Sequence, residues 1–151
     1  MIEHNEHFLA QLKRHEGLKL EAYRCPAGAL TVGYGHNCDV WPVLGVNRVG
    51  DTISRSMAEE LLLEDVTGIA EDLDFLWPWW REMEEPRQAV LLNMAFNLGS
   101  PKLKTFKRMI GALKVGDYPR AGTEMLDSNW AKQVKGRATE LARQMVLGDW
   151  E

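Results

Sequence analysis

The sequence predicts an α+β fold that is mainly helical, with a small N-terminal β-sheet and a helical C-terminal lobe. Glycines and a proline interrupt a run of alternating apolar residues between positions 18 and 36, which is typical of short strands joined by turns. Apolar residues recur at helical spacing over most of the rest of the chain. With 151 residues, 45% of them hydrophobic, and no repeat or low-complexity linker, the chain is expected to form one domain, residues 1–151.

The first elements follow from local patterns. The segment FLAQLKRH, from Phe8 to about His15, places its apolar side chains on one face, so we expect a short amphipathic helix that ends near Gly17. Alternation then runs through residues 18–36, which predicts a hairpin or a three-stranded sheet. The sheet-bearing lobe is expected over about 15–50.

Helices are expected after the sheet. Ser54 is a suitable N-cap for a long helix over about 54–74, which the WPWW run ends. A helical lobe is predicted over about 86–151, beginning with a helix from about Pro86 to Gly99 and continuing with two or three helices over 103–147. The WPWW tryptophans suit packing between helices better than a platform for sugars, and Trp130 and Trp150 are assigned to the C-terminal core.

Composition excludes several classes of protein. No run reaches the roughly 18 to 20 apolar residues of a membrane span, and the charged start differs from a signal peptide. We therefore expect a protein made in a cytoplasm without stable membrane insertion. The two cysteines and four histidines lack the spacing of a metal site, so no metal and no cofactor are predicted.

Charge is distributed unevenly. The net charge of −4 argues against a nucleic-acid binder, which is usually basic. Residues 1–100 contain 8 Lys and Arg and 16 Asp and Glu, which gives −8, whereas residues 101–151 contain 10 and 6, which gives +4. The basic part either faces an anionic polymer, such as a cell-wall glycan, or is an ordinary solvated helical surface.

One spacing carries the chemistry. Glu16 is followed after eight residues by Cys25, and Cys25 after five by Thr31, within RHEGLKLEAYRCPAGALTVGYGH. This pattern resembles the phage T4-type lysozyme family, glycoside hydrolase family 24, in which Asp or Cys takes the second position. TVGYGH, AEELLLEDV, RQAVLLNMAFNLG and SNWAKQVKGRA resemble further segments of that family in the same order. The resemblance covers about residues 15–150 and implies a lysozyme-like catalytic domain.

The resemblance implies a glycoside hydrolase, a lysozyme or N-acetylmuramidase. It is expected to cleave the β-1,4 bond between N-acetylmuramic acid and N-acetylglucosamine. Such cleavage needs an acid that protonates the leaving oxygen and a group that activates or holds water across the sugar. Glu16 is expected to be the acid, while Thr31 orients the water on the opposite face, which implies inversion.

Cys25 departs from the members of the family that carry Asp. A thiol with an ordinary pKa near 8.5 is only a few per cent ionised at pH 7, unless a positive neighbour such as Arg24 lowers the pKa. Cys25 therefore stabilises the transition state, activates water or attacks the sugar, or it merely fills space. A regulatory disulfide between Cys25 and Cys38 is a further hypothesis.

Five other residues take expected roles from the resemblance. Arg137 is expected to pair with the catalytic Glu16, while His36 and Asp65 form a buried structural ion pair between the sheet and the long helix. Phe96 is expected to line the sugar cleft, and Gly35 to let the backbone approach the glycan closely.

The expected partner is peptidoglycan, bound by a monomer. The protein is expected to be made in the host cytoplasm and to act on the wall in the periplasm after a separate holin permeabilises the membrane, as in host lysis. Two alternatives stay open: an inactive glycan-binding module of the same fold, and a lytic transglycosylase.

Overall fold

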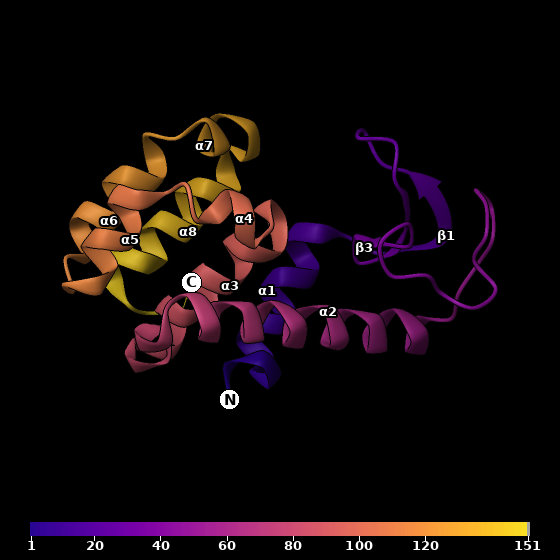
Figure 1. The fold of residues 1–151 in the computed structure, drawn as a ribbon, viewed down its shortest axis with the longest axis horizontal. Helices are drawn as coiled ribbons and strands as arrows, with labels where there is room; N and C mark the ends of the chain where they lie inside the picture. The colour runs from indigo at the N-terminus through magenta and orange to yellow at the C-terminus, as the bar shows by residue number, and fades with distance from the viewer. Residues whose placement is uncertain (151) are drawn as a thin grey trace. The chain divides into compact units, whose positions relative to one another are not determined.

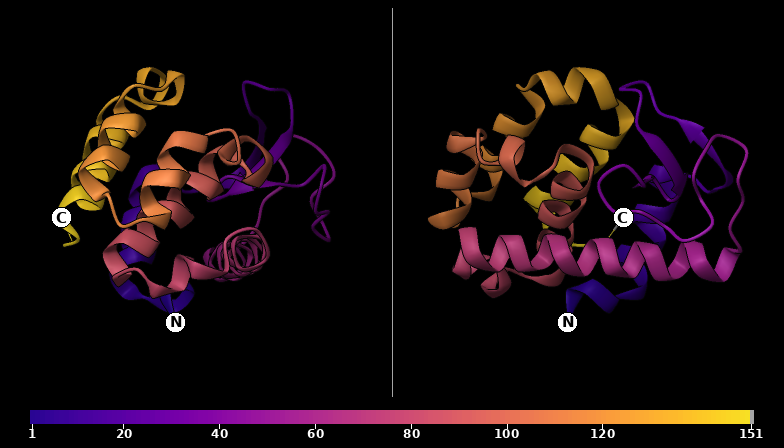
Figure 2. Two further views of the ribbon diagram at one scale, coloured as in Figure 1. Left: turned by 60° about the vertical axis from the view of Figure 1, so that its left-hand side comes forward. Right: turned by 45° about the vertical axis from the view of Figure 1, so that its right-hand side comes forward.

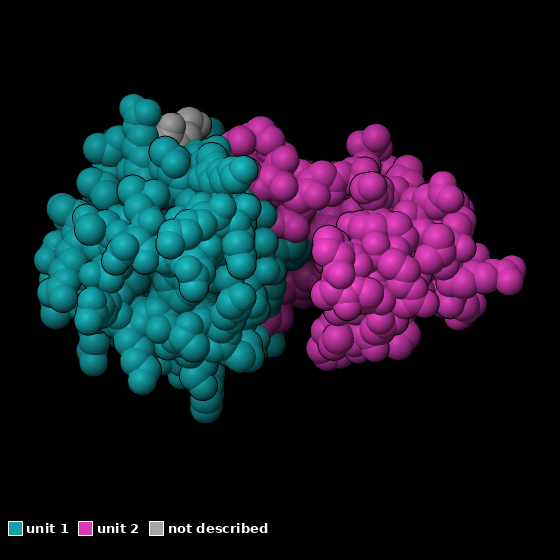
Figure 3. Space-filling view, turned by 90° about the horizontal axis from the view of Figure 1, so that it is seen from above, with its two compact units in different colours: residues 1–8, 69–151 teal, residues 9–68 magenta. Residues whose placement is uncertain are grey.

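The computed structural model describes residues 1–150, and it contains one small antiparallel sheet among many helices (Figure 1). This confirms the predicted α+β, mainly helical class. The chain forms two compact units, which Figure 3 shows in different colours. Unit 2 comprises residues 9–68, and unit 1 combines residues 1–8 with the part of the chain from residue 69 onward.

Unit 2 contains the sheet. Strands β1 (Lys19–Arg24), β2 (Leu30–Gly33) and β3 (His36–Asn37) are antiparallel in the order β1-β2-β3, so three strands form. Tyr23 lies opposite Thr31 in the ladder between β1 and β2. The core of this unit consists of buried apolar side chains from the sheet, the following loop and the long helix: Ala22, Leu30, Val32, Cys38, Val43, Val46 and Leu61.

Helix α1 (Glu6–Glu16) begins earlier than the expected Phe8. The side chain of Asn5 accepts a hydrogen bond from the backbone N–H of Phe8 at 3.0 Å, which caps the first turn. The helix ends at Gly17, whose φ of 72° is favoured by glycine and whose N–H donates to the Lys13 carbonyl at 2.9 Å. Glu16 is therefore the last helical residue, directly before β1.

Helix α2 (Arg55–Leu76) is the long helix, and its bounds are close to those expected. The Ser54 hydroxyl accepts from the N–H of Met57 at 3.0 Å, which confirms Ser54 as the N-cap. After Trp77 the chain continues as the short 3₁₀ helix η2 (Pro78–Glu82). Proline cannot donate to the helical ladder, which accounts for the end of α2.

Unit 1 is built around α3 (Glu85–Leu98), in which residues 87–95 are all buried. As expected, α3 ends at Gly99, whose φ is 85°. The other elements of unit 1 are short: η1 (Ile2–His4), α4 (Ser100–Leu103), α5 (Lys107–Lys114), α6 (Tyr118–Leu126), α7 (Asn129–Val134) and α8 (Gly136–Leu147). Figure 2 shows α5 to α8 gathered together in the orange-to-yellow part of the chain.

The expectation of two or three helices over 103–147 is wrong, because four helices lie there. Asp117 and Ser128 each begin a new helix by accepting from a backbone N–H three residues ahead, at 3.2 Å and 3.1 Å. These two N-caps divide the helical pattern of apolar residues over 103–147 into more helices than the sequence predicts.

The tryptophans mainly pack within unit 1. Trp80 is fully buried and its indole N–H donates to Asp74 at 2.8 Å, so packing is confirmed for this member of the WPWW run. Trp130 is buried as expected. Trp150 is half-buried and stacks on His7 with ring centroids 5.2 Å apart.

Residues 1–150 include no helix that is both long and apolar enough to cross a bilayer. Over the same residues, His, Cys, Asp and Glu side chains do not gather in threes or more as a metal site requires.

Candidate active site

Glu16 presents its carboxyl group at the junction between α1 and β1. One carboxylate oxygen, Oε2, is buried. Gly35 lies against the other oxygen, since a Cβ added at Gly35 would be 3.0 Å from Glu16 Oε1. Gly35 is exposed and has a φ of 74°, so its lack of a side chain serves both the turn and the close approach to Glu16.

Cys25 lies in the turn between β1 and β2, half-exposed and with a free thiol. The pKa of the Cys25 thiol is lowered, chiefly because the backbone amide of Ala29 donates to its sulfur. Partial burial opposes this effect, while the amides of Ala27 and Gly28 and the hydroxyl of Thr31 add to it. Several hydrogen-bond donors near the sulfur therefore favour the ionised thiolate over the neutral thiol.

The main causes of the lowered pKa are these donors, and Arg24, the positive neighbour suggested from the sequence, is not one of them. Arg24 is the last residue of β1, and Cys25 follows it in the turn. The Arg24 guanidinium instead donates to the carbonyl of Gly28 at 3.2 Å and lies 3.9 Å from Asp39.

Thr31 is buried on β2, with its hydroxyl oxygen 2.9 Å from the Ala29 carbonyl, to which it can donate. The same hydroxyl helps to lower the pKa of the Cys25 thiol, so it can also donate to the sulfur. Because a hydroxyl has only one proton, it donates to one of these acceptors at a time. In the structure it donates to Ala29, and beside a thiolate it can turn its proton to the sulfur.

Tyr23 is a member of this group that sequence reasoning missed. It lies opposite Thr31 in the ladder, so the two side chains share a face of the sheet. Burial raises the pKa of Tyr23, and the nearby charges of Cys25 and Glu16 raise it further. The structure thus groups Thr31 with Cys25, Gly35 with Glu16, and Tyr23 with both acidic groups. The pairing of β1 with β2, which sets Tyr23 opposite Thr31, is what reveals Tyr23.

His36 and Asp65 form a contact between β3 and α2. The His36 Nδ1 atom lies 2.8 Å from Asp65 Oδ2, and Nε2 lies 2.8 Å from the carbonyl oxygen of Trp41. Burial alone lowers the pKa of His36, but the hydrogen bonds to Asp65 and Trp41 outweigh it and the pKa is raised. A protonated ring donates to both acceptors, which suits a structural link.

Two expected site residues lie in unit 1. Arg137, on α8, donates from Nε and Nη2 to the side-chain oxygen of Asn93 at 3.0 Å and 2.8 Å. Asn93 is fully buried on α3 and was not predicted as a site residue, although a polar residue inside the apolar run AVLLNMAF is a recognisable signal. Phe96 is half-buried on the same helix.

Comparison with known proteins identifies the class. Residues 13–144 match the family described as Phage lysozyme. The chain is 32% identical to an endolysin of Acyrthosiphon pisum secondary endosymbiont phage 1, over 91% of this chain and 86% of that protein. It is 30% identical to the pre-baseplate central spike protein Gp5 of Enterobacteria phage T4, over 93% of this chain but only 28% of that protein. It is also 26% identical to probable T4-type lysozyme 2 of Dictyostelium discoideum, over 91% of this chain and 92% of that protein.

The fold and these matches define a glycosidase of the lysozyme class, which acts on peptidoglycan. The chain belongs to the phage lysozyme family, of the T4 type.

Proposed function

We propose that this lysozyme hydrolyses the β-1,4 bond between N-acetylmuramic acid and N-acetylglucosamine with inversion, using Glu16, Cys25 and Thr31. The observation that carries the proposal is the Cys25 sulfur held by backbone amides and the Thr31 hydroxyl. Such a site stabilises a negative charge without a carboxylate, which supports a thiolate in the place that Asp takes in other members of the family.

The proposed reaction needs one acid and one base. Glu16 donates its proton to the glycosidic oxygen as the bond to the anomeric carbon breaks. A water held by Thr31 attacks that carbon from the opposite face, and the Cys25 thiolate takes the proton of the water. The products are a reducing muramic acid end and a free hydroxyl on the glucosamine, and proton exchange with solvent resets both groups.

Other residues are proposed to support this reaction. Arg137, held by Asn93, orients the Glu16 carboxyl, while Gly35 and Phe96 contact the glycan. His36 and Asp65 are structural and join the sheet to α2. We propose that both units act as a single catalytic domain and a monomer.

The proposed biological role is host cell lysis. The enzyme would be made in the host cytoplasm and would reach the wall from the periplasmic side once a holin has permeabilised the membrane. Its similarity to an endolysin over most of both chains supports this role.

Clearing of outer-membrane-permeabilised bacteria tests the catalytic assignment. Wild type should clear the suspension, and Glu16→Gln, which keeps the size of the side chain, should not. Both proteins should melt at the same temperature by circular dichroism. Binding to purified wall without clearing by wild type would instead indicate an inactive glycan-binding module.

Product analysis tests the type of reaction. Mass spectrometry should find reducing muramic acid ends, and NMR of the first products should find the inverted anomer. Anhydro sugars would identify a lytic transglycosylase and overturn the proposal.

The dependence of the rate on pH tests the role of Cys25. A base acts only when deprotonated, so kcat should fall as the pH drops through the lowered pKa of the Cys25 thiol. Cys25→Asp should move this limb to lower pH, and Cys25→Ala should lower kcat by about 100-fold or more. An unchanged profile in Cys25→Ala would contradict a thiolate base.

A further inference from the structure

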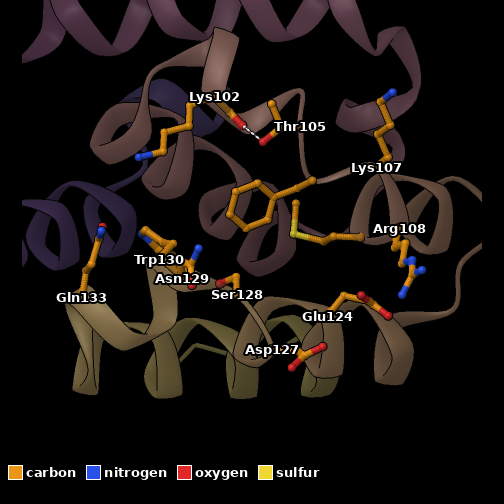
Figure 4. A pocket seen from close by; sticks show the side chains of 12 residues that line it. Lys102, Thr105, Lys107, Arg108, Glu124, Asp127, Ser128, Asn129, Trp130 and Gln133 are labelled. Carbon is orange, nitrogen blue, oxygen red and sulfur yellow. Dashed lines mark hydrogen bonds between the residues drawn. The ribbon is translucent and has the colours of Figure 1, made fainter.

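Three side chains of unit 2 form a polar cluster that joins α1, the turn between β2 and β3, and α2. Lys13 Nζ lies 2.6 Å from Glu59 Oε2, and the Tyr34 hydroxyl donates to Glu59 Oε1 at 3.3 Å. Lys13 Nζ also lies 5.8 Å from the centroid of the Tyr34 ring, within the range of a cation–π contact. Each member of this group, the Tyr34 cluster, therefore contacts the other two. None of them lines the pocket of about 520 Å³ in unit 1, whose lining residues lie between positions 102 and 133 (Figure 4).

The Tyr34 cluster is adjacent to Glu16 on two elements. Lys13 precedes Glu16 by three residues on α1, so the two lie one turn apart on the same side of the helix. Tyr34 directly precedes Gly35, where an added Cβ would lie 3.0 Å from Glu16 Oε1. The cluster thus joins the helix that carries Glu16 to the turn that lies against its carboxyl group.

The turn depends on Tyr34 for its attachment, because Tyr34 is flanked by two glycines. Gly33 and Gly35 have φ values of 71° and 74°, and neither has a side chain that could fix the backbone. Tyr34 is buried, and its hydroxyl reaches Glu59 on α2. A Cβ added at Gly33 would lie 3.5 Å from the Cβ of Ala58, so the turn also packs on α2 directly beside Glu59.

The charges of the cluster determine which group donates and which accepts. The hydrogen bond from Lys13 is the main reason that the pKa of Glu59 is lowered. Burial, and then the charge of Glu59, raise the pKa of Tyr34. Near neutral pH Glu59 is therefore an ionised acceptor and Tyr34 a neutral donor. Lys13 and Glu59 are both about one-third exposed, and such an ion pair contributes little to the stability of a fold.

We propose that Tyr34 is a positioning residue for Glu16. Through Glu59 and Lys13 it holds the backbone of Gly35 against the Glu16 carboxyl, which keeps that group in one position for proton transfer. The inference rests on the proposed function, in which Glu16 is the acid, and it adds three side chains that no substrate needs to touch.

Kinetics of variants test the proposal. Tyr34→Phe removes only the hydroxyl and should lower kcat on soluble peptidoglycan strands by about tenfold without changing KM, because a misplaced acid slows the chemical step. Glu59→Gln should have a similar effect. The double variant should lose no more than the weaker single variant, since both changes break the same link. An unchanged kcat in Tyr34→Phe, or losses that multiply in the double variant, would overturn the proposal.

Matched variants separate positioning from a general loss of stability. Lys13→Met should lower kcat about tenfold, whereas Lys13→Arg keeps the charge and a donor for Glu59 and should retain most of the activity. Glu60→Gln removes an exposed carboxylate from the next position of α2 and should leave kcat unchanged. All rates are measured well below the melting temperature of each variant. Losses of kcat that follow the melting temperatures, or that Lys13→Arg fails to rescue, would contradict a positioning role.

Backbone dynamics test the link without any measurement of activity. NMR order parameters of Gly33 and Gly35 should fall in Tyr34→Phe and Glu59→Gln, and should equal those of wild type in Glu60→Gln. Unchanged order in Tyr34→Phe, or lost order with unchanged kcat, would overturn the inference. Failure of the proposed function is seen separately, because it would show as clearing of bacteria by Glu16→Gln whatever the order of the two glycines.

Discussion

At Gly35 both the backbone conformation and the position of Glu16 favour glycine. Its φ of 74° is unfavourable for other residues, and a Cβ there would be 3.0 Å from Glu16 Oε1. Gly45 has a φ of 87° but nothing within 4 Å of an added Cβ, so it offers the same backbone strain without the contact. Comparing substitutions at Gly35 and Gly45 therefore separates the effect of the contact with Glu16 from the effect of backbone strain.

Gly35→Ala and Gly45→Ala should each lower the free energy of unfolding by about 1 to 2 kcal/mol. Only Gly35→Ala should also lower kcat/KM, by about tenfold, because the methyl group displaces the carboxyl of Glu16. Denaturant unfolding and the rate of wall hydrolysis check both expectations. An equal loss of activity in both variants would show that backbone strain alone is responsible.

His36 links stability to pH. Its pKa is raised in the folded protein from an ordinary value of 6.5, so the stabilisation from protonated His36 is complete below that value. The stabilisation is lost as the pH rises through the raised folded pKa. Asp65→Asn should therefore cost about 3 kcal/mol at pH 5.5 and clearly less at pH 9. Thermal unfolding of wild type and Asp65→Asn at both pH values measures the difference in their stability. A difference that does not change with pH would contradict this link.

At the scale of elements, Arg87 joins the start of α3 to the end of α8. Its buried guanidinium donates to the carbonyls of Met145 and Val146 at 2.7 Å and 2.9 Å. These carbonyls lie in the last turn of α8, where carbonyl groups have no hydrogen-bond partner within the helix. It also stacks on Tyr118 at 3.6 Å and leaves no room for a side chain at Gly148. One side chain thus holds three segments of unit 1.

Arg87→Met should lower the free energy of unfolding by about 2 kcal/mol or more, because the carbonyls of Met145 and Val146 lose charged donors. Arg120→Met removes an exposed arginine from α6 and should change stability by less than about 0.5 kcal/mol. Urea unfolding followed by circular dichroism compares the two. Similar costs would mean that the loss of charge matters more than the capping of α8.

At the scale of the whole molecule, the reactivity of the two cysteines measures different properties: Cys25 its local exposure, and Cys38 the opening of the folded structure. Both thiols are free, but Cys25 is half-exposed while Cys38 belongs to the core of unit 2. Burial, and then the charges of Asp39 and Asp65, raise the pKa of Cys38. The regulatory disulfide between Cys25 and Cys38 stays a prediction, and in this structure both thiols are reduced.

Native protein should therefore react with a thiol reagent in two phases, quickly at Cys25 and slowly at Cys38, since only opening of unit 2 exposes the second thiol. In Cys25→Ser only the slow phase should remain, and denaturant should make it fast. Mass spectrometry of timed samples counts the labels. A fast phase at Cys38 in the native protein would contradict its place in the core.

Much of this fold and part of its site follow from local signals. Gly17, Ser54 and Gly99 end or begin helices through contacts with residues three or four positions away, and period-two alternation reveals the sheet. For that reason the sequence alone determined that Glu16 ends a helix and that Thr31 lies on a strand. Cys25, which was also expected on the sheet, lies in the turn just after β1. The spacing of these three residues also led to the correct family.

Only the tertiary structure decided what surrounds those groups. Periodicity reports which face is buried, but it does not report where a turn points its amides or which distant polar groups meet. Backbone amides, rather than Arg24, therefore surround the Cys25 sulfur. Arg137 meets Asn93 across 44 positions of the chain. Such contacts depend on packing in three dimensions, which no short-range pattern encodes.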